Sequence, residues 1–237
     1  MNTKLYSGII CSLIILGGCT AEADVKLENN KDKASYVIGV QLGTQMSQTK
    51  DDIDLDKVMV GLKESFAGKE PRMTKEEMMA AMQEFQQAMQ QKTQAKMMET
   101  GAKNAKEGEV FLAENKKKDG VITLPSGLQY KVITAGKGKS PKASDTVVTN
   151  YRGSLIDGKV FDSSYERGEP VTFPVNGVIP GWTEALQKMK TGDKWQLVIP
   201  SNLAYGENGQ GPISPNSVLI FDIELLEIKA AKINALA

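Results

Sequence analysis

A long stretch without helix-breaking residues constrains the fold of this 237-residue chain more than any other feature. No proline occurs between Pro71 and Pro125, and residues 74–118 are dominated by Ala, Gln, Glu, Lys and Met, which all favour helices. Thr74 and Glu77 match a capping box at the start of this stretch. A continuous helix there would run roughly 65 Å at about 1.5 Å per residue. We therefore expect a linking helix over residues 74–119 that separates two modules.

The expected linking helix has apolar ends and a polar middle. Near its start, apolar residues repeat at a spacing typical of helix packing: Met78, Met82, Phe85 and Met89. Gly101 and Gly108 lie further along, at positions where a bend would fall. Seven of the eleven methionines lie between Met73 and Met98. They indicate either an adaptable surface for unfolded proteins or ordinary helix packing, and we favour packing.

Two shorter helical patterns precede the linking helix. Residues 33–48 contain Gly39 and Gly43, whose spacing of four would let two helices approach closely. In the second pattern Asp54 can cap the helix, Gly68 can end it, and one face is apolar, with Leu55, Met59, Leu62 and Phe66. Two such helices cannot bury enough surface alone. We expect residues 19–73 to form a dimerisation domain with an N-terminal tether, and a homodimer through residues 24–90.

Beyond residue 120 the pattern changes to strands. Alternation over residues 128–132 and 146–151 predicts strands, and Asp157-Gly158 predicts a tight hairpin turn. Further strands are expected over residues 195–199 and 218–228, with one short helix over residues 182–189. The predicted fold class is α+β. An antiparallel sheet over residues 120–237 wraps a short helix, and the long α-helix joins it to an all-α N-terminal module.

Charge and composition exclude several functions. The chain has 29 basic and 29 acidic residues and no basic stripe, so nucleic acid is not an expected partner. It contains no histidine, which excludes Ser-His and Cys-His catalysis and every metal site that uses histidine. Both cysteines, Cys11 and Cys19, lie close to the N-terminus. We expect no metal and no cofactor.

The N-terminus is typical of an export signal. Lys4 precedes an apolar run over residues 9–16 that is too short to cross a bilayer as a helix. Residues 16–19, Leu-Gly-Gly-Cys, resemble the lipobox of bacterial lipoproteins, which makes residues 1–18 a signal peptide and Cys19 the lipidated residue. We expect an outer membrane lipoprotein that faces the periplasm or the surface, held to the membrane only by its lipid. Cleavage after Ala23 would instead release a soluble periplasmic protein, and either route leads to the bacterial cell envelope.

Three motifs follow one another in the strand-rich region. They are residues 151–164, which include the hairpin turn, residues 178–182, Val-Ile-Pro-Gly-Trp, and residues 204–206, Ala-Tyr-Gly. In this order they resemble the FKBP-type peptidyl-prolyl cis/trans isomerases. The whole chain resembles the Mip (macrophage infectivity potentiator) branch of bacterial envelope FKBPs. That resemblance implies dimers through intertwined N-terminal helices, and substrates that are unfolded or partly folded proline-containing proteins.

The resemblance also implies a role for each pocket residue. Trp182 would form the floor under the proline ring. The backbone N–H of Ile179 and the hydroxyl of Tyr205 would hold substrate carbonyls, and Asp162 would lie beside the twisting carbonyl. The expected substrate-binding residues are Tyr151, Phe161, Arg167, Val178 and Phe221. Val171 stands where many relatives have an aromatic residue, with Phe173 on the same strand face as cover, so binding of macrolide inhibitors is left open.

The sequence leaves three functions to compare. The first is an isomerase that accelerates folding of exported proteins, with chaperone activity of the dimer. The second is a holdase chaperone in which a cleft between two copies does the work and the pocket only binds. The third is a surface-anchored protein that binds proline-rich segments.

Overall fold

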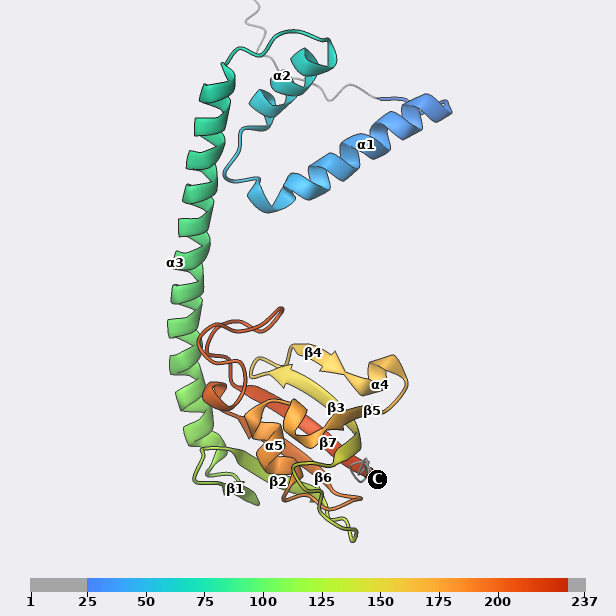
Figure 1. The fold of residues 1–237 in the computed structure, drawn as a ribbon, viewed down its shortest axis with the longest axis vertical. Helices are drawn as coiled ribbons and strands as arrows, with labels where there is room; N and C mark the ends of the chain where they lie inside the picture. The colour runs from blue at the N-terminus through green and yellow to red at the C-terminus, as the bar shows by residue number, and fades with distance from the viewer. Residues whose placement is uncertain (1–24, 230–237) are drawn as a thin grey trace, which may run out of the picture. The chain divides into compact units, whose positions relative to one another are not determined.

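The structure, a computed structural model, describes residues 25–229 (Figure 1). The predictions about the signal peptide, Cys19 and cleavage after Ala23 lie outside these residues. The chain divides into two compact units, residues 1–75 and 76–237. Within residues 25–229 no helix combines the length and the apolar character needed to span a bilayer.

The first unit consists of short helices whose ends are determined locally. Helix α1 (Asn30–Met46) starts with a capping box, in which Asn29 and Asp32 each accept a hydrogen bond from the other's backbone N–H. A 3-10 turn, η1 (Ser47–Thr49), follows. Asp54 caps α2 (Leu55–Phe66) by accepting from two backbone N–H groups, as the sequence predicted. No residue of α1 or α2 is buried.

The second unit begins with the long helix. Helix α3 (Lys75–Asn115) is continuous and ends four residues before the end of the predicted range 74–119. It runs unbroken through Gly101 and Gly108, both of which are buried. A glycine in a helix interior is a weak point unless something requires the missing side chain. Here the requirement is close contact: an added Cβ would lie 3.1 Å from Pro215 at Gly101 and 2.7 Å from Val218 at Gly108.

A seven-stranded antiparallel sheet follows, in the order β1-β2-β6-β7-β3-β4, with β5 also paired to β3. The strands are β1 (Val121–Thr123), β2 (Gln129–Thr134), β3 (Thr146–Leu155), β4 (Val160–Ser163), β5 (Val171–Pro174), β6 (Lys194–Ile199) and β7 (Leu219–Lys229). The antiparallel sheet and the α+β class are confirmed. The sequence prediction missed β1 and the short helix α4 (Ser164–Arg167).

One face of the sheet packs on helix α5 (Pro180–Leu186), near the predicted 182–189. A short 3-10 turn, η2 (Val175–Gly177), precedes α5, and another, η3 (Ser201–Leu203), follows β6. The core joins Trp182 and Leu186 of α5 to Leu197, Leu219 and other buried residues of the strands. Alternation along β6 directs Trp195, Leu197 and Ile199 to this core.

The predicted hairpin at Asp157-Gly158 is confirmed. The Leu155 N–H donates to the Lys159 carbonyl at 2.9 Å, and Gly158 has φ 87°, which a residue with a side chain adopts poorly. The Asp157 carboxylate accepts from the Lys159 N–H at 2.9 Å. This turn returns the chain along β3, so that β4 brings Phe161 and Asp162 next to Gly153.

Candidate active site

A cavity of about 660 Å³ opens in the sheet domain, within the range of small-molecule and peptide sites. Strands β3, β4, β5 and β7, helix α5 and the loop after η3 all contribute to it. The lining is Tyr151, Phe161, Asp162, Phe173, Gly177, Val178, Ile179, Trp182, Tyr205, Gln210, Gly211, Pro212, Ile213 and Phe221. Asp162 is the one charged residue in this lining, so the cavity is an apolar pocket with a single fixed charge at its edge.

Trp182 lies at the centre of the aromatic residues of the pocket. Its ring meets three others edge to face, with centroids 5.1 Å from Tyr151, 5.7 Å from Phe173 and 5.1 Å from Phe221. Such pairs each contribute about 0.5–1.5 kcal/mol beyond the area they bury. Trp182 is 4% exposed, so this packing fixes the orientation of its ring.

Two glycines make room for this arrangement. At Gly153 an added Cβ would lie 2.7 Å from the rings of both Phe161 and Phe221, which pack edge to face at 5.5 Å. At Gly181 it would lie 2.6 Å from the Ile199 side chain, because α5 rests directly on β6. A side chain at Gly153 would displace an aromatic ring of the pocket, and one at Gly181 would push α5 away from Ile199.

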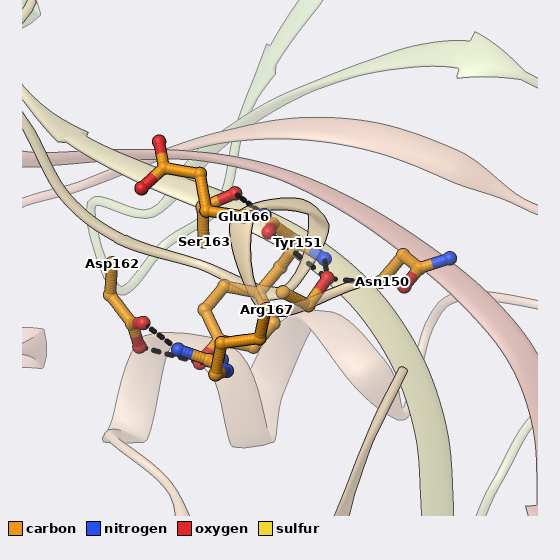
Figure 2. A network of polar contacts seen from close by, with 7 residues as sticks. Asn150, Tyr151, Asp162, Ser163, Glu166 and Arg167 are labelled. Carbon is orange, nitrogen blue, oxygen red and sulfur yellow. Dashed lines mark hydrogen bonds and ion pairs between the residues drawn. The ribbon is translucent and has the colours of Figure 1, made fainter. Parts of the chain in front are cut away.

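A polar network holds Asp162 at the edge of the pocket (Figure 2). The Tyr151 hydroxyl donates to the carboxylate at 2.5 Å, and Arg167 forms an ion pair with the same carboxylate. Arg167 also donates to the Tyr151 hydroxyl at 2.7 Å. The carboxylate is therefore fixed by two donors that also contact each other.

Helix α4 places Arg167 in this network. Ser163 caps the helix by accepting from the Glu166 N–H, and Gly168, with φ 77°, ends it. Ser164 attaches the helix to β3, because its hydroxyl accepts from the Tyr151 N–H at 2.9 Å. Figure 2 shows Arg167 extending from this turn to the Asp162 carboxylate.

The electrostatics leave no group ready to move a proton near neutral pH. Partial burial acts to raise the pKa of Asp162, but hydrogen bonds from Tyr151 and Arg167 oppose it and hold that pKa below its usual value. Burial, followed by the hydrogen bond to Asp162, raises the pKa of Tyr151. Burial and the nearby Asp162 charge raise the pKa of Tyr205. Asp162 is therefore ionised and both tyrosines are protonated. Within residues 25–229 no group of acidic, cysteine or histidine side chains is arranged to hold a metal ion.

Comparisons with known proteins agree with this geometry. Residues 137–226 match the family described as FKBP-type peptidyl-prolyl cis-trans isomerase, and residues 31–132 match the domain amino-terminal to it. The peptidyl-prolyl cis-trans isomerase Mip of Coxiella burnetii is 49% identical over 92% of this chain and 95% of its own length. The outer membrane protein MIP of Legionella longbeachae is 42% identical over 98% of this chain and 100% of its own. This chain belongs to the FKBP-type peptidyl-prolyl cis-trans isomerases.

A solved structure supports the same assignment for the fold. The crystal structure of FkpA from Escherichia coli covers 86% of this chain and 99% of its own, with 44% identity and a TM-score of 0.68. The predicted resemblance to Mip-type FKBPs is thus confirmed. Like other FKBP-type isomerases, this enzyme acts on proline-containing substrates.

The structure brings together the residues that the sequence selected for the FKBP site. Eight of the nine line the pocket: Tyr151, Phe161, Asp162, Val178, Ile179, Trp182, Tyr205 and Phe221. Arg167 lies outside the lining and contacts the pocket through Asp162 and Tyr151. The individual roles of these residues stay predictions.

Two parts of the FKBP pocket contribute more to its lining than the sequence predicted. Phe173 is a full member of the lining, whereas Val171 packs on the core beside it. The loop residues Gln210, Gly211, Pro212 and Ile213 also line the pocket. None of these four loop residues is among those that the sequence selected for the site.

Proposed function

We propose that this FKBP-type isomerase accelerates X–Pro isomerisation during the folding of exported envelope proteins, by desolvating and twisting the amide in its apolar pocket. The observation that carries the proposal is a pocket of packed aromatic rings with one ionised carboxylate held by a tyrosine and an arginine. Nothing in it suits a nucleophilic or acid–base reaction, since its titratable groups keep one protonation state around neutral pH.

Rotation about an X–Pro bond needs no bond cleavage and no proton transfer. Its barrier is about 18–20 kcal/mol, because the amide loses its partial double bond when it twists. Water favours the planar, polar ground state more than the twisted state. A dry pocket therefore lowers the barrier, since it removes this preferential solvation.

Each pocket residue has a role in this mechanism. Trp182 is the floor on which the proline ring rests, and Phe161, Phe221 and Tyr151 exclude water around it. Asp162 acts on the twisting carbonyl by its charge and position. The Tyr205 hydroxyl and the backbone N–H of Ile179 hold the carbonyls on either side of the bond. Arg167 acts through Asp162, whose carboxylate it orients.

The envelope is the compartment that the proposal assigns to the enzyme. The apolar run over residues 9–16 and the following Cys19 support export and lipidation, with soluble periplasmic release as the alternative. The Legionella longbeachae relative is named an outer membrane protein, which supports the same compartment. Uncatalysed X–Pro isomerisation takes tens of seconds and limits folding of many proteins, so a folding catalyst has a task there.

The N-terminal helices support a homodimer through residues 24–90. Their apolar side chains are exposed in the single chain, including Val37 and Ile38 of α1 and Leu62 and Phe66 of α2. A second copy of the chain is the simplest partner for such faces.

One observation also favours the holdase function for this dimer. Methionines along α3 are exposed, with Met79 at 65% and Met98 at 68%. Flexible thioether side chains repack against varied apolar partners, which suits binding of unfolded chains.

The test of the isomerase mechanism is cis/trans exchange of a short X–Pro peptide. We expect Asp162→Ala to lower kcat/KM roughly tenfold, which corresponds to about 1.4 kcal/mol of barrier, and Trp182→Ala to lower it further. Asp157→Ala is the matched control, because Asp157 lies in the same hairpin, accepts a hydrogen bond from Lys159 of its own turn and is not part of the pocket lining. Full activity of both pocket variants would contradict the mechanism. If the peptide exchanges no faster with the wild-type protein than in buffer, the pocket serves only as a binding site.

Deletion of residues 24–73 separates the two activities. We expect monomers that isomerise short peptides normally but handle whole proteins poorly. If these monomers refold a proline-limited protein as well as the full chain does, the proposed role of the dimer is wrong.

A further inference from the structure

The second half of α3 has a small, polar face that packs on the sheet domain. The buried residues of this helix are Gly101, Gly108 and Asn115, each seven positions apart, and Asn104 lies between the first two on the same face. Such spacing returns to one side of a helix every two turns. Figure 1 shows this green half of the helix beside the sheet.

The chain segment that meets the upper part of this face is the base of the loop 206–217. At Gly101 an added Cβ would lie 3.1 Å from the Pro215 Cβ and 3.4 Å from the Asn216 side-chain nitrogen. The helix backbone and the loop therefore touch directly. A side chain at position 101 would separate them.

Hydrogen bonds hold the loop base to the helix. The Asn104 side-chain N–H group donates to the Pro215 carbonyl at 2.8 Å and reaches the Ser217 hydroxyl at 3.4 Å. In the other direction, Asn216 donates to the Gly101 carbonyl at 3.3 Å. Asn216 has φ 56°, and among the described residues it is the one non-glycine in the left-handed region. Contacts with α3 on both sides of Asn216 stabilise this conformation.

The same loop extends from the helix to the pocket. Its base is closed by a hydrogen bond of 2.9 Å from the Asn216 N–H to the Gly206 carbonyl, and Gly206 directly follows Tyr205. Its tip is closed by two hydrogen bonds of 2.9 Å between Gln210 and Ile213. Both Tyr205 and Ile213 line the pocket, and Ile213 is 6% exposed. A shift of the loop base would therefore be passed to the pocket wall.

We infer that Asn104 is a positioning residue for isomerisation. It fixes the loop 206–217 against α3, and the loop in turn fixes Tyr205 and the pocket wall at Gln210–Ile213. The linking helix thus sets the shape of one side of the substrate site. The inference rests on the proposed function of the pocket.

The matched comparison is Asn104→Ala against Asn115→Ala in the full chain. Both residues are asparagines on the same face of α3, but Asn115 donates to Gln129 of β2 at 2.8 Å, whereas Asn104 donates to the loop. We expect Asn104→Ala to lower kcat/KM for X–Pro peptides roughly fivefold, the effect of one lost hydrogen bond. The ratio between peptides with leucine and glutamate before proline should also change. Asn115→Ala should lower the melting temperature and leave both kinetic quantities unchanged.

Amide chemical shifts give a second measurement. The shifts of the loop amides would not change if Asn104 only stabilised the fold. In Asn104→Ala the amide signals of Gln210, Gly211 and Ile213 should shift, whereas in Asn115→Ala they should stay in place. Equal kinetic losses in both variants would overturn the inference, because they would mean general loosening of the domain. Unchanged kinetics in Asn104→Ala would overturn it as well.

A second variant covers the case in which Asn104→Ala does not fold. Asn216→Gly keeps the left-handed backbone and removes the hydrogen bond to Gly101, so the same kinetic and spectral changes are expected. Asp162→Ala measured in the same series separates the two claims. A large effect of Asp162→Ala without any effect of the loop variants would refute only the positioning role. Absence of both effects would refute the use of the pocket itself.

Discussion

Helices α2 and α5 show how differently the two regions of this isomerase are stabilised. Helix α2 has 12 residues, none of them buried, and Phe66 at its end is 93% exposed. Helix α5 has only 7 residues, and four of them are buried: Gly181, Trp182, Ala185 and Leu186. Both sequences carry an apolar face, but only α5 finds its partner within the same chain.

The sequence of a helix can therefore be specified separately from the surface on which it packs. The capping by Asp54 and the apolar spacing are enough to define where α2 begins and which face is apolar. Isolated helices of this length are marginal in water, so the exposed face needs a further contact. The sheet domain is complete without one, and the whole pocket lies within it. The proposed assembly and the chemistry thus lie in different regions.

The glycines of α3 and α1 show the same difference between the two regions. An added Cβ at Gly101 or Gly108 would meet Pro215 or Val218, whereas at Gly39 or Gly43 of α1 nothing lies within 4 Å. The glycines of α3 are therefore explained by contacts within the chain. Those of α1 have space that a second copy would fill in the proposed dimer.

The largest expected difference comes from shortening one apolar side chain in each region. Leu197→Ala, at a fully buried position, should lower the free energy of unfolding by about 3–5 kcal/mol. Phe66→Ala should change the unfolding free energy of the single chain by less than about 0.5 kcal/mol, as exposed positions do. Urea unfolding at low and high protein concentration measures both. A loss in Phe66→Ala that appears only at high concentration is the signature of a second copy, and an equal loss at all concentrations would contradict it.

Alanine in place of a glycine should have a smaller effect. In α3 it should change the stability of the single chain, and in α1 it should change the affinity of the dimer. Gly108→Ala gains about 1 kcal/mol of helix propensity, but its methyl meets the buried Val218, and overpacking costs about 1–3 kcal/mol, so we expect net destabilisation of the single chain. Gly39→Ala should leave the sheet domain unchanged and weaken the dimer. Thermal unfolding checks the first variant and sedimentation checks the second. A dimer of Gly39→Ala as tight as wild type would exclude close helix approach at that position.

The residues of the pocket were predicted from the sequence more completely than the contacts that hold them in place. Residues such as Tyr151 and Trp182 belong to short motifs whose spacing is visible along the chain. The role of Gly101 was not visible, because its contact with Pro215 joins positions far apart in the sequence. From composition alone a glycine in a helix indicates weakness. The structure gives the physical reason for the glycine, which is the close approach of the Pro215 and Asn216 side chains.

The position of Phe173 depended on strand register in the same way. Val147 pairs with Phe173 and Thr149 with Val171, so both β5 residues face the same side of the sheet. Only the packing of the rings decides that Phe173, at 5.7 Å from Trp182, fills the wall. Local alternation predicts a face but not which residue reaches the cavity.

The smallest expected effect concerns pH. Exchange of X–Pro peptides should be nearly constant between about pH 5 and 9, because the pKa of Asp162 is lowered and those of Tyr151 and Tyr205 are raised. A lowered pKa in the folded state stabilises the fold above the ordinary carboxyl pKa of about 3.9. This contribution is lost as pH falls through the lower folded value.

Thermal unfolding between pH 2 and 6 checks the acid side of this expectation. Wild type should lose slightly more stability on acidification than Asp162→Ala does, and the partial exposure of the carboxylate keeps the difference small. A rate that rises or falls tenfold near pH 7 would contradict the absence of proton transfer.

The most direct test of the proposed division between assembly and chemistry is sedimentation equilibrium combined with peptide exchange on the same samples. The two proteins compared are residues 24–237 and the same chain with Phe66→Glu. The wild-type chain should sediment as a dimer, and Phe66→Glu as a monomer, because a charge at this apolar face opposes its burial. The exchange rate per protomer should be the same in both. A wild-type monomer at all concentrations, or a rate that falls when the dimer dissociates, would contradict the account.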